Sequence, residues 1–179
     1  MNAKMSTVLL GLAFVVLLVV SYVENAVFFS ILGDVLRNQY LAVAMLFIHN
    51  LLVVSLILLG MTFYVNLVLN FLKQDKYTDV VFEHPGTFAI VFAVVILLLS
   101  ILRGSDLVYG GITVEALPVI LLVSAPVGII EGYGIYLTIK KTLGRTMGMK
   151  DLVYIYGIFF MAAIVEVSFI NVLVWVSTS

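Results

Sequence analysis

The chain has 179 residues, of which 64% are hydrophobic and only 11% are charged. Soluble domains are typically no more than half apolar and about a quarter charged, so this composition excludes a soluble domain of any size. The net charge of −1 argues against nucleic-acid binding, and the absence of cysteine excludes disulfides and thiolate metal sites. We therefore expect an all-α, polytopic transmembrane helical bundle in which residues 1–179 form a single domain within the lipid bilayer.

Five apolar runs predict five principal membrane spans. The first, Thr7–Phe29, is too long for the apolar part of a signal peptide, and no small-x-small cleavage site follows it. It is therefore expected to be a retained helix that also serves as a signal anchor. Three further single spans are expected at Thr87–Leu102, Leu117–Ile139 and Leu152–Val176.

The second run, Leu41–Leu72, is longer than the roughly 20 residues that a membrane core requires. Tilt or a break in the helix would absorb the excess length. Gly60 lies near the middle of the run and is the natural place for a bend, because glycine weakens a helix. The run is expected to be either one bent span or a span followed by a re-entrant or broken piece.

The distribution of lysine and arginine predicts the orientation. With five spans, seven basic residues lie on one side and two, Arg37 and Arg103, on the other. Basic residues concentrate in cytoplasmic loops, so we expect a multi-pass protein of the cell membrane with its N-terminus cytoplasmic and its C-terminus outside. The seven residues assigned to the cytoplasmic side are Lys4, Lys73, Lys76, Lys140, Lys141, Arg145 and Lys150.

One carboxylate, Glu131, lies deep inside the fourth apolar run. Ionisable groups at such depth are costly and are usually functional or paired. Pro126 precedes it and allows a hinge, while Gly128 and Gly132 form a small-xxx-small pair that favours close helix packing.

With this topology, most of the polar residues inside the spans fall in the outer half of the membrane. Buried polar groups seek each other in lipid, so a polar cluster or cavity is expected there, with Glu131 at its lower edge. For Glu24, near the end of its run, a solvated helix end is the simpler explanation. If Glu131 and Glu166 approach each other, they are expected to share one proton. The predicted cluster contains Glu131, Glu166, His49, Asn50, Asn171 and Glu24.

The run Pro126-Val127-Gly128-Ile129-Ile130-Glu131 resembles the Pro-His-Gly-x-x-Glu signature of the stage II sporulation protein M family of integral membrane proteins. The run Ala162-Ala163-Ile164-Val165-Glu166 is similar to the Ala-Ala-x-x-Glu run of that family. Asn50, Gly60 and Asn70 are similar to further positions, but Phe71 stands where the family has a glycine after the asparagine. Val127 stands where the family has histidine. The resemblance implies a multi-helix membrane protein that is similar in fold to exporter permease subunits and acts as a scaffold in a complex.

Two functional hypotheses from different classes follow. The first is a membrane scaffold or permease-like component without intrinsic catalysis, acting with protein partners or as a homo-oligomer. The second is a small autonomous transporter or channel that uses Glu131 and Glu166. An intramembrane metal enzyme ranks below both, because the chain has no His-Glu-x-x-His, Glu-x-x-His or Gly-x-Ser-x-Gly pattern. We expect no metal and no other cofactor.

Overall fold

The structure is a computed structural model that describes residues 3–35, 38–71, 81–109 and 117–178. Within these ranges side chains are described except at 29–30, 32–34, 100–109, 117, 119–120, 122–124 and 172–178. All regular secondary structure in the described ranges is helical, which confirms the predicted all-α class.

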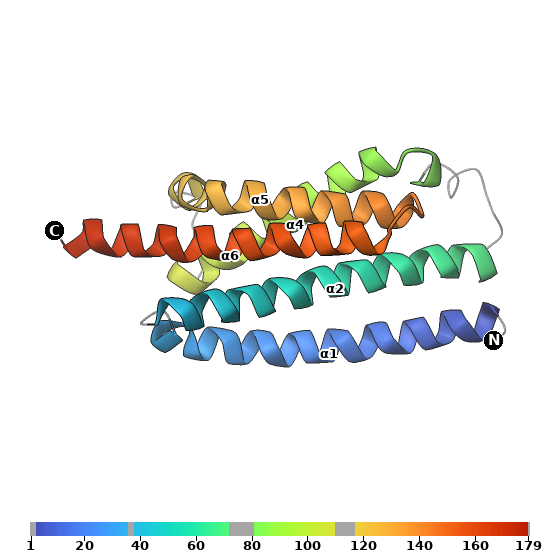
Figure 1. Cartoon of the computed structure of the whole chain (residues 1–179), viewed down its shortest axis with the longest axis horizontal. Helices are drawn as coiled ribbons and strands as arrows, with labels where there is room; N and C mark the ends of the chain where they lie inside the picture. The colour runs from blue at the N-terminus through green and yellow to red at the C-terminus, as the bar shows by residue number, and fades with distance from the viewer. Residues whose placement is uncertain (1–2, 36–37, 72–80, 110–116, 179) are drawn as a thin grey trace.

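Five long helices account for most of the described chain. Successive helices run in opposite directions, and the two ends of the chain lie at opposite ends of the bundle (Figure 1). The helices are α1 (Ala3–Val35), α2 (Gln39–Phe71), α4 (Pro85–Tyr109), α5 (Leu117–Leu143) and α6 (Met149–Thr178).

Three helices are long and apolar enough, in their described parts, to cross a membrane. They are the segments Ala3–Phe28, Gln39–Phe71 and Met149–Asn171. A shorter apolar segment, Pro85–Leu99, forms the first part of α4. These segments identify the chain as a membrane protein, because a continuous apolar helix of this length matches the roughly 30 Å hydrocarbon core of a bilayer.

Of the two forms expected for the second run, a broken or re-entrant piece is absent, because α2 continues as one helix of 33 residues through Gly60. The glycine serves close packing instead. A Cβ atom at Gly60 would lie 2.9 Å from the ring of Phe14 on α1, and one at Gly11 would lie 2.9 Å from the ring of Phe63 on α2. The two rings stack with their centroids 6.3 Å apart. Each helix thus supplies a glycine slot and the phenylalanine that fills the slot of the other.

Two other helices extend beyond their apolar runs. α1 continues to Val35, beyond the predicted run Thr7–Phe29, and α4 continues to Tyr109, beyond the predicted run Thr87–Leu102. An apolar run marks the thickness of the hydrocarbon, whereas helical hydrogen bonds continue into the headgroup region. Arg37, Lys73 and Lys76, on which the orientation prediction also relied, lie outside the described residues.

The helix α2 is central to the arrangement. It packs against α1 on one side and against α5 and α6 on another, while α4 packs mainly against α5. Figure 1 shows α2 between α1 and α6, with α4 behind α5 and α6. Most of α1 is exposed in the isolated chain, because only α2 covers it extensively.

Buried apolar side chains form two clusters along the bundle. One includes Val54 of α2 and Phe159 of α6, together with residues of α4 and α5 toward the end where α5 and α6 are connected. The other includes Leu46 of α2 and Ala163 of α6, together with residues of α1. Asn50 lies one helical turn from both Leu46 and Val54, so its side chain enters the bundle at the level between the clusters.

The connection between α5 and α6 is tightly defined. Backbone bonds from Arg145 N–H to the carbonyl of Thr142 (3.1 Å) and from Thr146 N–H to that of Lys141 (2.9 Å) form a Schellman cap. Arg145 occupies the left-handed position of this cap, with φ of 54°. Asp151 accepts a bond from Gly148 N–H at 3.0 Å and pairs with Lys141 at 3.2 Å, which fixes the start of α6.

Candidate functional site

Two consecutive residues of α2, His49 and Asn50, divide the polar side chains of the bundle into two groups. Neighbouring positions on an α-helix point about 100° apart, so their side chains face different neighbours. His49 meets Glu24 of α1. Asn50 is close to Glu131 of α5, which in turn lies near Glu166 of α6.

The first group is an acid–base pair between α1 and α2, formed by Glu24 and His49. Nδ1 of His49 lies 3.1 Å from Oε2 and 3.3 Å from Oε1 of Glu24, and each side chain retains 19% of its exposure. A hydrogen bond from His49 to an ionised Glu24 requires the proton on Nδ1, because a carboxylate only accepts hydrogen bonds. The ring of Phe28, one turn beyond Glu24, stacks on the imidazole at 4.6 Å. The histidine is thereby held in one orientation.

This pair corrects the simple interpretation of Glu24 as a solvated helix end. α1 continues for eleven residues beyond Glu24, which corresponds to about 16 Å of further helix. The carboxylate therefore lies within the length of the bundle, and His49 supplies its partner. The sequence signal that would have found the pair is the position of both residues about ten places from the turn that joins α1 to α2.

The second group brings Asn50, Glu131 and Glu166 together from three helices. The side chain of Asn50 is close enough to the Glu131 carboxyl group to interact with it electrostatically. The carboxyl group of Glu166 is close enough to that of Glu131 for two negative charges to repel. Both glutamates are half-buried, and Asn50 is 7% exposed. Two acids with one amide can hold a proton or bind a cation, but they contain no internal positive charge.

The amide of Asn50 is incompletely satisfied. Its Nδ2 atom is buried without a hydrogen-bond partner at standard distance, although Glu131 is its polar neighbour. The Oδ1 atom of Asn25 is likewise buried without a partner. A buried polar atom in this state typically costs about 1–3 kcal/mol, so such atoms are uncommon and often lie at functional sites.

The structure thus places five of the six expected cluster residues in two groups, with α2 between them. Asn171 belongs to neither group. It lies five positions beyond Glu166 on α6, a rotation of about 140°, and is half-buried. Among the described residues, no three His, Asp or Glu side chains converge as metal ligands would.

The residues expected to provide packing or a hinge have different surroundings. A Cβ atom at Gly132 would lie 2.7 Å from Leu97 of α4, whereas one at Gly128 would meet no atom within 4 Å. Only one member of the small-xxx-small pair therefore packs closely within the chain. Pro126 is exposed, and α5 continues through it.

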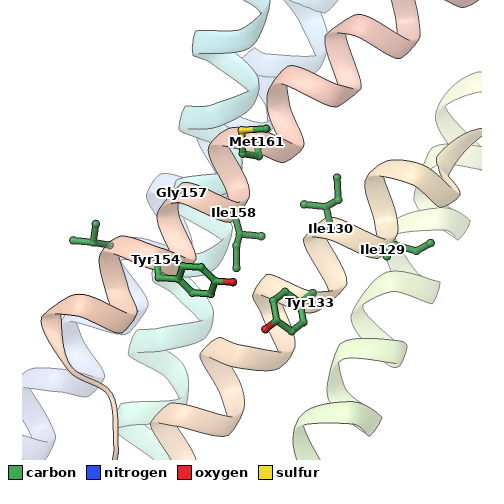
Figure 2. Close-up of a pocket in the computed structure, with 8 residues that line it drawn as sticks. Ile129, Ile130, Tyr133, Tyr154, Gly157, Ile158 and Met161 are labelled. Carbon is green, nitrogen blue, oxygen red and sulfur yellow. The ribbon is translucent and has the colours of Figure 1, made fainter.

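A groove of about 660 Å³ lies between α5 and α6, and no pattern in the sequence indicated it. Figure 2 shows it lined by side chains from both helices, with the rings of Tyr133 and Tyr154 on opposite walls. Neither carboxylate of the second group lines it. Its other lining residues include Ile129, Ile130, Ile158 and Met161.

Comparison of the chain with family models, curated proteins and solved structures found no match.

Proposed function

We propose that the chain is a non-enzymatic integral membrane component, a scaffold or permease-like subunit that works with protein partners or as a homo-oligomer. The observation that carries the proposal is the polar group formed by Asn50, Glu131 and Glu166. It connects α2, α5 and α6 at the level between the two apolar clusters. Polar contacts between membrane helices fix their relative positions, which is what a scaffold requires.

In this proposal each of the five long helices crosses the bilayer once. Their alternating directions and the opposite positions of the two chain ends support it (Figure 1). Lys4, Lys140, Lys141, Arg145 and Lys150 belong to helix ends and a turn at one end of the bundle, which we assign to the cytoplasm. The resemblance to the stage II sporulation protein M family points to the same type of protein and remains part of the proposal.

Single cysteines test this topology cleanly, because the chain has none of its own. Tyr40 and Met149 are 89% and 78% exposed and lie near opposite ends of the bundle. A membrane-impermeant maleimide added to intact cells is expected to label Tyr40→Cys, and to label Met149→Cys only after lysis. Equal labelling of both variants in intact cells would contradict the single-crossing topology.

A second candidate is an autonomous proton or cation transporter that uses Glu131 and Glu166. The unpartnered Nδ2 atom of Asn50 beside the two carboxyl groups favours it, because a site that changes occupancy need not be fully satisfied in one state. Against it, the groove between α5 and α6 reaches neither carboxylate.

The variants Glu131→Gln and Glu131→Leu separate the two candidates. As a scaffold, the protein is expected to keep its fold in Glu131→Gln, because the new amide remains a polar neighbour of Asn50, and to lose stability in Glu131→Leu. Neither the wild type nor either variant should then carry H⁺ or Na⁺ flux in proteoliposomes. Flux in the wild type that Glu131→Gln abolishes in a folded protein would replace the scaffold with the transporter.

A further inference from the structure

The groove between α5 and α6 is polar at one end and apolar along the rest of its length. Ile129, Ile130, Ile158 and Met161 provide the apolar walls. Gly157 widens the groove, since a Cβ atom there would meet no atom within 4 Å. Toward the connection between α5 and α6, the hydroxyls of Tyr133 and Tyr154 approach each other closely enough to interact (Figure 2).

A cation lies near this end of the groove. The ring of Tyr136 stacks on that of Tyr133 at 6.5 Å, and Nζ of Lys140 lies 5.2 Å from the centroid of the Tyr136 ring. The Lys140 ammonium is also within electrostatic range of Tyr133. Lys140 is exposed and lies in the last turn of α5, near Lys141, Arg145 and Lys150. The polar end of the groove therefore has two hydroxyls on its walls and a positive charge nearby.

These levels match the layers of a bilayer. Tyr133 and Lys140 are seven positions apart on α5, or about 10 Å, and the polar headgroup layer is roughly 5–7 Å deep on each side. A lysine at headgroup level therefore places the two hydroxyls near the boundary with the acyl chains. The apolar part of the groove then runs further toward the middle of the membrane.

We propose that this groove binds one anionic phospholipid, with its phosphate at Lys140, Tyr133 and Tyr154 and an acyl chain along the apolar walls. The charge complementarity at one end and the apolar remainder fit an amphipathic ligand. A partner helix, including one from a second copy of the chain, would not require a cation and two hydroxyls confined to one end. The inference needs only that the helices lie in a bilayer, and it does not depend on whether the protein is a scaffold.

The test compares phosphatidylglycerol with phosphatidylcholine, each added to delipidated protein in detergent. Native mass spectrometry counts bound lipids, and the thermal midpoint records their effect. We expect one tightly retained phosphatidylglycerol, which raises the midpoint more than phosphatidylcholine does. Lys140→Gln is expected to reduce this preference roughly fivefold, the scale of one basic side chain at an anionic headgroup. Equal retention of the two lipids by the wild type would overturn the proposal.

Gly157→Leu fills the groove, and Gly128→Leu is its matched control, because both glycines have open space at Cβ but only Gly157 lines the groove. Gly157→Leu is expected to lose the retained lipid and Gly128→Leu to keep it. If Gly157→Leu does not fold, Tyr154→Phe replaces it and is expected to weaken retention while leaving the ring in place. Unchanged lipid retention in the variant that folds would overturn the proposal. A mass spectrum in which the substitution removes a bound second copy of the chain, and no lipid, would overturn it as well.

Discussion

The two faces of α2 hold their polar side chains in different ways. Toward α1, His49 meets Glu24 at 3.1 Å, so a carboxylate has a partner that can carry positive charge. Toward α5 and α6, Asn50 meets Glu131, and the next ionisable group, Glu166, is another acid. The first arrangement is self-contained, whereas the second has an unpartnered amide hydrogen donor and an excess of acid.

This difference concerns how completely each group satisfies its own carboxyl groups. A carboxyl group that already has a histidine partner gains little by binding a further ion. Two neighbouring carboxyl groups resist joint ionisation and are more easily satisfied by a proton, a cation or a movement of α5 against α6. Both groups join helices of the bundle, but we expect substitutions of their acids to act in opposite ways, because one face loses a partner and the other loses a like-charged neighbour.

The largest effect that would test this comparison is expected from His49→Leu. The substitution leaves Glu24 without its partner, and breaking a buried pair in this way costs about 3 kcal/mol in the free energy of unfolding. Titration with sodium dodecyl sulfate in mixed micelles, followed by circular dichroism, measures the loss. The double variant Glu24→Leu/His49→Leu should regain most of it, because both polar groups are removed together. An equal loss in the single and double variants would show that the pair does not hold α1.

A second test concerns the packing that accompanies the pair on the α1 face. Gly60→Val would press a branched side chain against the Phe14 ring, since even a Cβ atom would lie only 2.9 Å from it. Overpacking of this kind costs about 2 kcal/mol. Gly128→Val is the control, because it makes the same substitution at a helical position where a Cβ atom would meet no atom within 4 Å. Equal unfolding free energies in the two variants, from the same titration, would show that close packing at Gly60 does not stabilise the contact between α1 and α2.

On the opposite face, Glu166→Gln is expected to change stability with the opposite sign. It removes one of two neighbouring acids and keeps the side-chain shape, so the free energy of unfolding should rise by about 1 kcal/mol. The matched substitution on the α1 face, Glu24→Gln, should lower it, because His49 loses a charged partner. If both substitutions lower stability in the same micelle titration, Glu166 does not destabilise its neighbour Glu131, and the two faces of α2 do not differ in sign.

The helical class and the ionisable residues inside the bundle could be predicted from the sequence. The length of the apolar runs predicts the helices, and the rarity of ionisable groups inside them identifies Glu24, His49, Glu131 and Glu166. The helix ends were less predictable. The helix α1 continues to Val35 because helical hydrogen bonding does not stop where the apolar run stops.

Partnership among those residues could not be predicted, because it depends on how the helices are arranged around α2. His49 and Asn50 are adjacent in sequence, and only the packing of α1 on one side and of α5 and α6 on another separates their partners. The packing role of Gly60 could not be predicted either, because it depends on contact with the Phe14 ring of another helix. The groove exists only through the spacing of α5 and α6.

The smallest effect is expected near the far end of the α1 face, where Asn70 donates a hydrogen bond from Nδ2 to Oγ1 of Thr7 at 2.9 Å. Asn70→Leu removes this link between α2 and α1. Thr7 would still donate to the carbonyl of Ala3 at 3.1 Å, so no buried hydroxyl loses its only partner. The cost should be about 0.6 kcal/mol, the average for an interhelical hydrogen bond in a membrane protein.

The neighbouring residue Asn66 provides a control, because its Nδ2 donates within α2 to the carbonyl of Thr62 at 2.9 Å. Asn66→Leu makes the same change in size and polarity without breaking a bond between helices. The micelle titration should therefore show a smaller loss than for Asn70→Leu. A loss of more than about 2 kcal/mol in the free energy of unfolding for Asn70→Leu would exceed the contribution of one such bond. It would indicate that Asn70, and not His49, makes the principal polar contact between α2 and α1.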